Sequence, residues 1–325
     1  MAALDGVLSL SRSLSEPLGW LVFALFLVGV ALEYYDREYA RLVLAGAWGL
    51  FAVFWATLIY PWFAIDHSVV RGVGAVLAVP LSVLVGKTLY EGRDSLFVLS
   101  RAIAIMGLVY VPVLMVAPVR EQLILLVTNQ TDWAMTLIGY DQPVVTDLSE
   151  VGVERDISGK TSDFENTFVF FLDGGGTITY SIVAACTGIG SMAVMVGLIG
   201  AVRAPFRRKL RALAIAVPII YLLNIGRNVM IAVTFGNQYM HLFPEWTMRL
   251  FGLDNPLKVS YIWVDRILAQ SLAVVAMILI FWLVLRELPE VVGPVEDVLY
   301  LLTGTEYDLA GALNMGPESS PEPAD

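Results

Sequence analysis

Long apolar blocks alternate with short polar stretches along most of the chain. Each block holds about 20 residues, the length of helix that crosses a hydrocarbon core of roughly 30 Å. The pattern predicts an all-α polytopic membrane protein with about seven transmembrane helices. The predicted spans cover residues 18–35, 42–64, 69–90, 96–118, 183–202, 208–232 and 262–285.

A less regular segment separates the fourth and fifth predicted spans. Residues 119–140 are moderately apolar but contain Glu121 and Asp132, so we expect a helix that lies on the membrane surface. Two runs rich in β-branched and aromatic residues, 167–172 and 177–183, flank an Asp-Gly-Gly-Gly sequence. This arrangement is typical of a β-hairpin, and it predicts a small β-containing insertion in the helical bundle.

These patterns divide the chain into four parts. Residues 1–118 contain the first four transmembrane helices, and residues 119–182 contain the interfacial helix and the β-hairpin. Residues 183–286 contain the last three helices, which carry the candidate catalytic residues described below. Residues 287–325 form an acidic tail, and its proline-rich end is expected to be disordered.

The composition agrees with a membrane protein. Hydrophobic residues make up 58% of the chain and charged residues 15%, whereas soluble domains contain about 45–50% apolar and about 25% charged residues. The formal net charge is −10, and the acidic residues lie outside the apolar blocks. An acidic aqueous surface argues against a nucleic-acid partner and fits a salt-loving organism.

The distribution of basic residues predicts how the helices are oriented. Lys and Arg accumulate in cytoplasmic loops, and the densest basic cluster, residues 203–211, lies between the fifth and sixth predicted spans. With that cluster inside, three further basic segments also fall inside. The N-terminus is then outside, the C-terminus is cytoplasmic, and the insertion at 119–182 is extracellular. The other inside segments contain Arg37 and Arg41, then Lys87, Arg93 and Arg101, and finally Arg286.

Cys186 is the only cysteine, so the chain cannot form an intramolecular disulfide. It lies where the second strand of the predicted hairpin runs into the fifth span, at the outer membrane surface. Gly188 and Gly190 follow it and permit a close approach of the backbone. A helix N-terminus favours a thiolate over a thiol. The alternative is that Cys186 is a small buried apolar residue.

Two arginines are predicted at the same membrane level as Cys186. Arg227 follows Lys209 by 18 residues, or about 27 Å of helix, which places it near the outer interface. Arg266 begins the seventh predicted span, which runs inward from the outer side. Either arginine could instead serve as an interfacial anchor, with Arg266 paired to Asp265.

A thiolate flanked by two guanidinium groups is a plausible catalytic arrangement. One cation favours the thiolate, and the other can stabilise an oxyanion when a carbonyl is attacked. Asn224 and Asn228 lie on the helical face of Arg227, and we interpret them as fixing its orientation. Arginine cannot act as a general base near neutral pH, so the proton acceptor must lie elsewhere or the thiolate must be pre-formed.

The two histidines are the remaining candidates for chemistry. His67 and His241 both map to outer loops, and neither accompanies a cluster of Cys or carboxylate residues. We therefore predict no metal site and no cofactor. Both histidines are interpreted as structural or incidental, with His241 the better candidate for a proton acceptor.

The three candidate segments resemble, in the same order, the three motifs of the archaeosortase/exosortase family. They are residues 185–190 (Ala-Cys-Thr-Gly-Ile-Gly), 224–228 (Asn-Ile-Gly-Arg-Asn) and 265–266 (Asp-Arg). The resemblance covers roughly residues 90–285. It implies that Cys186 is the nucleophile and that Arg227 and Arg266 are its partners. Related bacterial exosortases carry His at the third position, so Arg266 fits the archaeal pattern.

The resemblance also implies a function. Members of the family are membrane-embedded cysteine transpeptidases that cleave a C-terminal sorting signal of secreted proteins. The signal consists of a short motif such as Pro-Gly-Phe, a transmembrane helix and a basic end, and the new C-terminus is thought to be joined to a membrane lipid. The implied partners are surface proteins with this signal and the acceptor lipid. The alternative is a non-enzymatic multi-span transporter or receptor, although residues 262–285 lack the Lys of a retinal receptor and no inverted repeat is evident.

Overall fold

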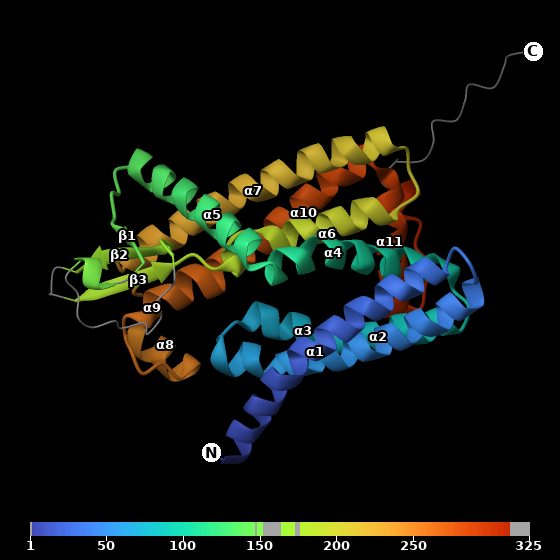
Figure 1. Cartoon of the computed structure of the whole chain (residues 1–325), viewed down its shortest axis with the longest axis horizontal. Coiled ribbons are helices and arrows are strands. Elements are labelled where there is room, and N and C mark those ends of the chain that lie inside the picture. The colour runs from blue at the N-terminus through green and yellow to red at the C-terminus, as the bar shows by residue number, and fades with distance from the viewer. Residues whose placement is uncertain (1, 147, 152–163, 173–175, 313–325) are drawn as a thin grey trace, which may run out of the picture.

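The computed structural model describes residues 2–146, 148–151, 164–172 and 176–312. Within these residues, long helices run side by side along the longest axis of the molecule (Figure 1). The main helices are α1 (Ala2–Leu32), α2 (Arg37–Tyr60), α3 (Val69–Tyr90), α4 (Phe97–Met115), α5 (Ala117–Leu137), α6 (Ile189–Ala201), α7 (Phe206–Gly236), α8 (Pro244–Phe251), α9 (Lys258–Tyr261), α10 (Gln270–Glu287), α11 (Val292–Thr303) and α12 (Leu309–Ala312).

Among the residues that the structure describes, five helical segments are long and apolar enough to cross a membrane. They are Arg37–Ile65, Val69–Tyr90, Asp94–Met115, Phe206–Gly236 and Lys258–Glu287. The other two predicted spans coincide with the shorter apolar helices Pro17–Leu32 and Ile189–Ala201. The 13 residues of α6 rise only about 20 Å, less than a core of roughly 30 Å. The multi-pass helical fold is therefore confirmed, whereas the count of seven full spans is not.

The first three helices pack on one another in chain order, and α4 completes their core. Phe26 of α1 meets Trp48 of α2 edge to face, with ring centroids 5.2 Å apart. Leu89 of α3 and Phe97 of α4 are buried in the same apolar cluster. The indole of Trp48 donates a hydrogen bond of 2.9 Å to the hydroxyl of Ser100. This bond satisfies a polar group that would otherwise be unpaired inside the bundle.

Helix α4 also belongs to a second group of helices. In this group α4 packs on α6, α6 on α7, and α7 on α10. Helices α4 and α6 approach closely at Gly197, where an added Cβ would lie 2.5 Å from the carbonyl oxygen of Ala102. A larger residue at this position would force the two helices apart. Ile199 of α6, Ala216 of α7 and Val284 of α10 lie in one buried apolar cluster, which joins these three helices.

A three-stranded antiparallel sheet covers one end of the second group. Its strands are β1 (Val144–Val145), β2 (Thr167–Phe171) and β3 (Thr177–Ser181), in the order β1-β2-β3. The predicted hairpin is confirmed, with Phe168 opposite Tyr180. Strand β1 was not predicted, because two residues are too few to show an alternating pattern.

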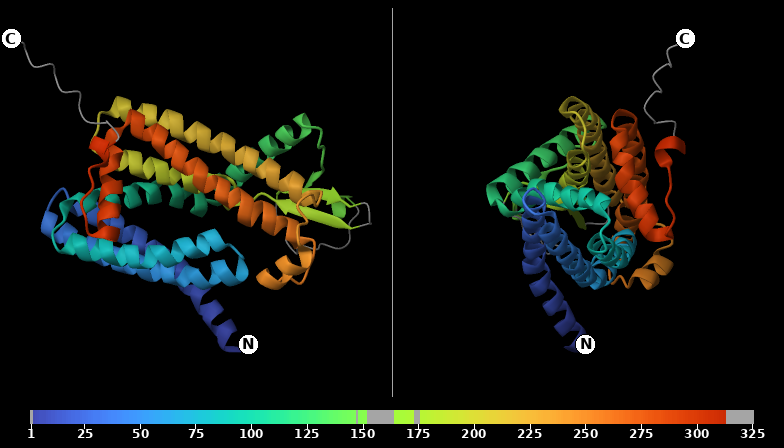
Figure 2. Two further views of the ribbon diagram at one scale, coloured as in Figure 1. Left: turned by 180° about the vertical axis from the view of Figure 1, so that it is seen from behind. Right: turned by 90° about the vertical axis from the view of Figure 1, so that its right-hand side faces the viewer.

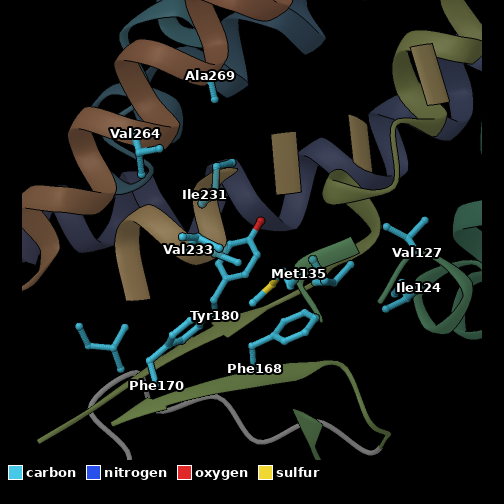
Figure 3. Packing of buried hydrophobic residues seen from close by; sticks show 13 residues of the cluster. Ile124, Val127, Met135, Phe168, Phe170, Tyr180, Ile231, Val233, Val264 and Ala269 are labelled. Carbon is cyan, nitrogen blue, oxygen red and sulfur yellow. The ribbon is translucent and has the colours of Figure 1, made fainter. Parts of the chain in front are cut away.

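The inner face of the sheet packs against α5 and α7. Phe168, Phe170 and Tyr180 are buried there with Met135 of α5 and Ile231 of α7 (Figure 3). A helix is thus present where residues 119–140 predicted one, although its position at a membrane surface stays a prediction. The sheet is anchored directly to the membrane helices, so its strands hold a fixed position relative to α7.

The loops gather at two opposite ends of the bundle (Figures 1 and 2). The basic end contains the turns at 33–36, 91–96 and 202–205, together with α11, and the sheet end contains β1–β3, α8 and α9. Ion pairs tie the basic end together, including Arg41 with Asp94 at 2.7 Å and Arg208 with Glu290. The structure therefore groups the basic loops as the orientation argument requires, without showing which side of a membrane they face.

The described part of the predicted acidic tail, up to residue 312, is largely helical. Helix α11 and the short α12 occupy much of the segment from residue 292 to residue 312, and Pro294 and Asp297 of α11 are buried. The predicted disorder of the proline-rich end falls on residues 317–325, which lie outside the described residues.

Candidate active site

Cys186 lies in a short 3-10 turn, Ala184–Cys186, between strand β3 and helix α6. Its side chain is half-buried and free. The fifth span was predicted to begin at residue 183, whereas helix α6 begins only at Ile189. Gly188 explains the late start, because it adopts a left-handed conformation with φ 76° that few other residues tolerate. Cys186 therefore lies three residues before the first residue of α6.

The same glycine allows the Cys186 turn to pack against α7. A Cβ added at Gly188 would lie 3.0 Å from Cγ and 3.1 Å from Cβ of Asn224. A side chain at Gly188 would thus be strained both by its φ angle and by lack of space. The sequence Cys-Thr-Gly requires glycine here for physical reasons that are independent of any catalytic role.

Two amides of α7 hold the backbone carbonyl of Cys186. The Nδ2 of Asn224 donates to this oxygen at 2.7 Å, and the Nδ2 of Asn228 donates at 2.9 Å. Asn228 in turn accepts a hydrogen bond of 3.4 Å from the hydroxyl of Tyr180. The sequence-based interpretation that the two asparagines fix the orientation of Arg227 is wrong. Their amides reach the turn that packs on α7, and they fix the peptide plane of Cys186.

Arg227 and Arg266 meet at a single carboxylate, that of Asp265. The Nη2 of Arg227 lies 2.6 Å from Oδ1 of Asp265, and the Nη1 of Arg266 lies 3.5 Å from Oδ2. Arg227 lies on α7 between Asn224 and Asn228, whose amides hold the Cys186 carbonyl. The structure thus brings all three predicted site residues to the sheet end, with Arg227 next to the helix turn that holds Cys186 and Arg266 joined to Arg227 through Asp265.

Aromatic side chains surround this polar cluster. Tyr180 is buried on β3, and burial, with a smaller contribution from Cys186, raises the pKa of Tyr180 well above its usual value of 10. Its hydroxyl therefore stays protonated and available as a donor. The guanidinium of Arg266 lies over the ring of Tyr261, 5.2 Å from its centroid. Tyr180 was not predicted as a site residue, although the alternation of Ile178, Tyr180 and Ile182 along the sequence indicates one shared apolar face.

The histidines occupy different environments. His241 is exposed in the loop after α7. His67 is half-buried before α3, and burial together with the positive charges of Arg266 and Lys258 lowers its pKa from the usual 6.5. The neighbouring hydroxyl of Ser68 donates a 2.9 Å hydrogen bond to Gln270 of α10. The sequence favoured His241 as a proton acceptor, but His67 is the histidine that experiences the field of Arg266.

Comparison with known proteins identifies the family. A family model described as transmembrane exosortase matches residues 12–256, a range that includes Cys186 and Arg227 and ends before Arg266.

The chain belongs to the transmembrane exosortase family.

Two curated proteins are similar to this exosortase-family chain over almost its whole length. An archaeosortase A of Haloferax volcanii is 44% identical, covering 93% of this chain and 98% of the relative. An archaeosortase A of Natronomonas pharaonis is 41% identical, covering 91% of each chain. The similarity extends well beyond the region 90–285 in which the motifs lie. No solved structure matches the chain.

Family membership confirms two parts of the sequence-based interpretation. The chain is a multi-pass membrane protein of the exosortase family, and its relatives support a membrane-bound protein-sorting transpeptidase. Within the part of the chain that the structure describes, no group of three or more His, Cys, Asp or Glu side chains is placed to hold a metal ion.

Proposed function

We propose that this chain is a cysteine transpeptidase that removes a C-terminal sorting signal of the Pro-Gly-Phe type from secreted proteins. It then transfers the new C-terminus to a membrane lipid. The observation that carries the proposal is the geometry around Cys186. The only thiol of the chain sits on a turn whose carbonyl is fixed by two amides of α7, the helix that carries Arg227 between those two amides.

The first step is acyl transfer to the enzyme. The thiolate of Cys186 attacks the peptide carbonyl of the signal, and a carbon–sulfur bond forms as the carbonyl becomes an oxyanion. The guanidinium of Arg227 stabilises that oxyanion. The carbon–nitrogen bond then breaks, the amine takes up a proton, and the released fragment carries away the transmembrane part of the signal. The truncated protein remains attached to Cys186 as a thioester.

The second step transfers the acyl group to a lipid. A hydroxyl or amine of the lipid headgroup attacks the thioester, loses its proton, and releases the thiolate of Cys186. The product is an ester or an amide of the truncated protein. The site lies where the sheet joins the membrane helices, so lipid headgroups are locally concentrated there. An acceptor held in place competes well with water for the thioester.

The active site is proposed to face the cell exterior, with the N-terminus outside and the C-terminus in the cytoplasm. Support comes from the basic loops, which the structure collects at the end opposite Cys186. The test is cysteine labelling on intact cells in a Cys186→Ala background. Asp141→Cys, exposed at the sheet end, should react with an impermeant thiol reagent, and Glu91→Cys, exposed at the basic end, should not. The reverse pattern would place the site in the cytoplasm and end the proposal for secreted substrates.

Substrate processing tests the chemistry. In wild-type cells, mass spectrometry of a surface protein with the tripartite signal should show a shortened C-terminus with added lipid mass. Cys186→Ala and Cys186→Ser should leave the signal attached, because neither side chain supplies a thiolate. Thr305→Ala, an exposed change at the basic end, is the matched control and should process normally.

Results that differ from these expectations would point to a different function. Normal processing in cells that carry Cys186→Ala would contradict the enzymatic role. A shortened C-terminus without lipid would identify a hydrolytic peptidase instead of a transpeptidase. Both variants must be shown to be inserted in the membrane at the wild-type level, because loss of the protein would mimic loss of the thiol.

A further inference from the structure

Asp265 holds two arginines with one carboxylate. Its Oδ1 accepts a hydrogen bond from Nη2 of Arg227 at 2.6 Å, and its Oδ2 pairs with Nη1 of Arg266 at 3.5 Å. Only 6% of the Asp265 side chain is exposed. A carboxylate inside a membrane-spanning segment is costly unless it is paired, so its position between two cations needs an explanation.

The local helix geometry brings the bridge about. Residues 262–269 form a π-helical segment, which is a rare geometry that appears mostly at functional sites. Asp265 and Arg266 are consecutive, yet their side chains pair with each other and both are largely buried. Arg227 comes from a different span, α7. The carboxylate therefore ties the last membrane helix to the helix that holds the Cys186 turn.

The bridge also sets the charge next to the thiol. The hydroxyl of Tyr180 donates to Asn228, which holds the Cys186 carbonyl, and Arg227 follows Asn224, the other residue that holds it, by three positions. Tyr180 is a neutral donor, so the charge beside the turn arises from the arginines and from Asp265. Two guanidinium groups and one carboxylate leave a net charge of about +1. Without the carboxylate the same place would carry about +2.

We propose that Asp265 is a positioning residue, which holds Arg227 and Arg266 as a fixed pair and offsets one of their two charges. The inference rests on the proposed role of Cys186 as nucleophile. An unrestrained Arg227 would close on the thiolate and stabilise it, and a more stabilised thiolate is a weaker nucleophile. Because Asp265 holds it, Arg227 stays at the place where the oxyanion develops. The thiolate then keeps its nucleophilicity, and the guanidinium of Arg227 stabilises the oxyanion in the transition state.

The lone cysteine makes the charge measurable. A neutral alkylating reagent such as iodoacetamide modifies the thiolate of Cys186 and no other thiol of the protein. The pH midpoint of this alkylation, measured on the purified full-length protein in detergent, reports the local charge. Asp265→Asn keeps the shape of the side chain and removes the negative charge, so the midpoint should fall by about one pH unit.

Processing of a sorting substrate by Asp265→Asn should fall even though the thiolate fraction rises. We expect a loss of at least about tenfold, because the arginines are no longer fixed. Arg266→Gln is the reciprocal variant. It leaves Asp265 to neutralise Arg227, and the alkylation midpoint should therefore rise. A purely structural role for Asp265 would produce neither a fall for one variant nor a rise for the other.

The chain offers a matched control at its basic end. Asp94 also lies between two arginines, Arg37 at 3.3 Å and Arg41 at 2.7 Å. Asp94→Asn should leave both the alkylation midpoint and processing unchanged. Asp265→Glu retains the charge but displaces it by one methylene group, so it should keep the wild-type midpoint and process more slowly.

The outcomes separate this inference from the proposed function. An unchanged midpoint in Asp265→Asn and in Arg266→Gln overturns the positioning role, even if the wild-type protein processes its substrates. Absence of processing by the wild-type protein overturns the proposed function, while the alkylation midpoints still decide whether Asp265 sets the charge at the thiol. If Asp265→Asn does not fold, the alkylation midpoint of Arg266→Gln is the deciding measurement. A rise supports the positioning role of Asp265, and no rise overturns it.

Discussion

The two ends of the bundle contain the same ionic arrangement, a carboxylate between two arginines, in different surroundings. At the sheet end, Asp265 joins Arg227 and Arg266, and 6% of its side chain is exposed. At the basic end, Asp94 joins two arginines of α2, and 42% of its side chain is exposed. Both carboxylates pair across separate spans, since Arg41 and Asp94 are 53 residues apart and Arg227 and Asp265 are 38 residues apart.

The two clusters differ in how far water reaches the carboxylate. Exposed ion pairs contribute about 0–1 kcal/mol to stability, because solvent competes for both charges and salt screens them. A buried carboxylate cannot be solvated by water instead, and removing its partner typically costs about 3–5 kcal/mol. At the sheet end, Tyr180 and Tyr261 exclude water from the cluster, whereas the cluster of Asp94 is open. Only the buried set can keep its geometry fixed while a charged intermediate forms beside it.

The largest effect is expected when an arginine of the buried cluster loses its planar fork. Arg227→Lys should reduce substrate processing roughly 100-fold, since Lys cannot contact Asp265 and an oxyanion at the same time. Arg266→Lys should retain part of the activity, because Arg266 acts through Asp265. The exposed counterpart, Arg41→Lys, should process within about twofold of wild type. Equal losses at Arg227 and Arg41 would show that burial does not distinguish the two ends.

Removing one buried hydrogen bond from each end is expected to have an intermediate effect. Asn228→Ala removes one of the two hydrogen bonds to the Cys186 carbonyl and leaves the buried Tyr180 hydroxyl without its acceptor. Ser100→Ala leaves the indole of Trp48 unpaired nearer the basic end. Each unpaired polar group should lower the free energy of unfolding by about 1–3 kcal/mol. Processing per folded molecule should fall about tenfold for Asn228→Ala and stay unchanged for Ser100→Ala. Thermal unfolding in detergent, combined with the processing assay, distinguishes the two roles.

A smaller effect is expected where α11 is fastened to the bundle at the basic end. Asp297 accepts hydrogen bonds from Nε of Arg93 at 2.9 Å and from Oγ of Ser95 at 2.7 Å. Asp297→Ala should lower the free energy of unfolding by about 1–3 kcal/mol and leave processing by the folded protein unchanged. Glu306→Ala removes a 79% exposed partner of the same arginine and should not change stability. Loss of processing in folded Asp297→Ala would mean that the two ends are coupled.

The smallest effect concerns pH at the sheet end. The folded-state pKa of His67 lies below its usual 6.5 because of burial and of the charges on Arg266 and Lys258. Below pH 6.5 the unfolded chain therefore binds more protons at His67 than the folded chain, and stability decreases as the pH falls towards the folded-state pKa. His67→Gln should reduce the loss of thermal stability between pH 7.5 and pH 5, by less than about 4 °C. The exposed His241→Gln should have no such effect, and equal effects of both changes would contradict this assignment.

Several features followed from the sequence because they depend on local pattern. The apolar blocks predicted the helices, and the paired runs at 167–172 and 177–183 predicted the hairpin. Arg227 was predicted at one end by counting residues along a helix of known rise, and Cys186 and Arg266 were predicted there because they lie where spans begin. The predicted span bounds were wrong where local conformation changed. Gly188 delays the start of α6, and the full length of the fifth span was overestimated as a result.

The tertiary structure alone decided which of these groups touch. The carbonyl of Cys186 is bound by Asn224, 38 residues away, and Arg227 pairs with Asp265, also 38 residues away. Hydrophobic periodicity fixes which face of a helix is buried, but not the rotation and depth at which two helices meet. Close contacts at small residues, such as Gly188 against α7, set that depth. The sequence thus determined the end of the bundle at which the thiol and the arginines lie, and packing determined that Asp265 stands between the two arginines.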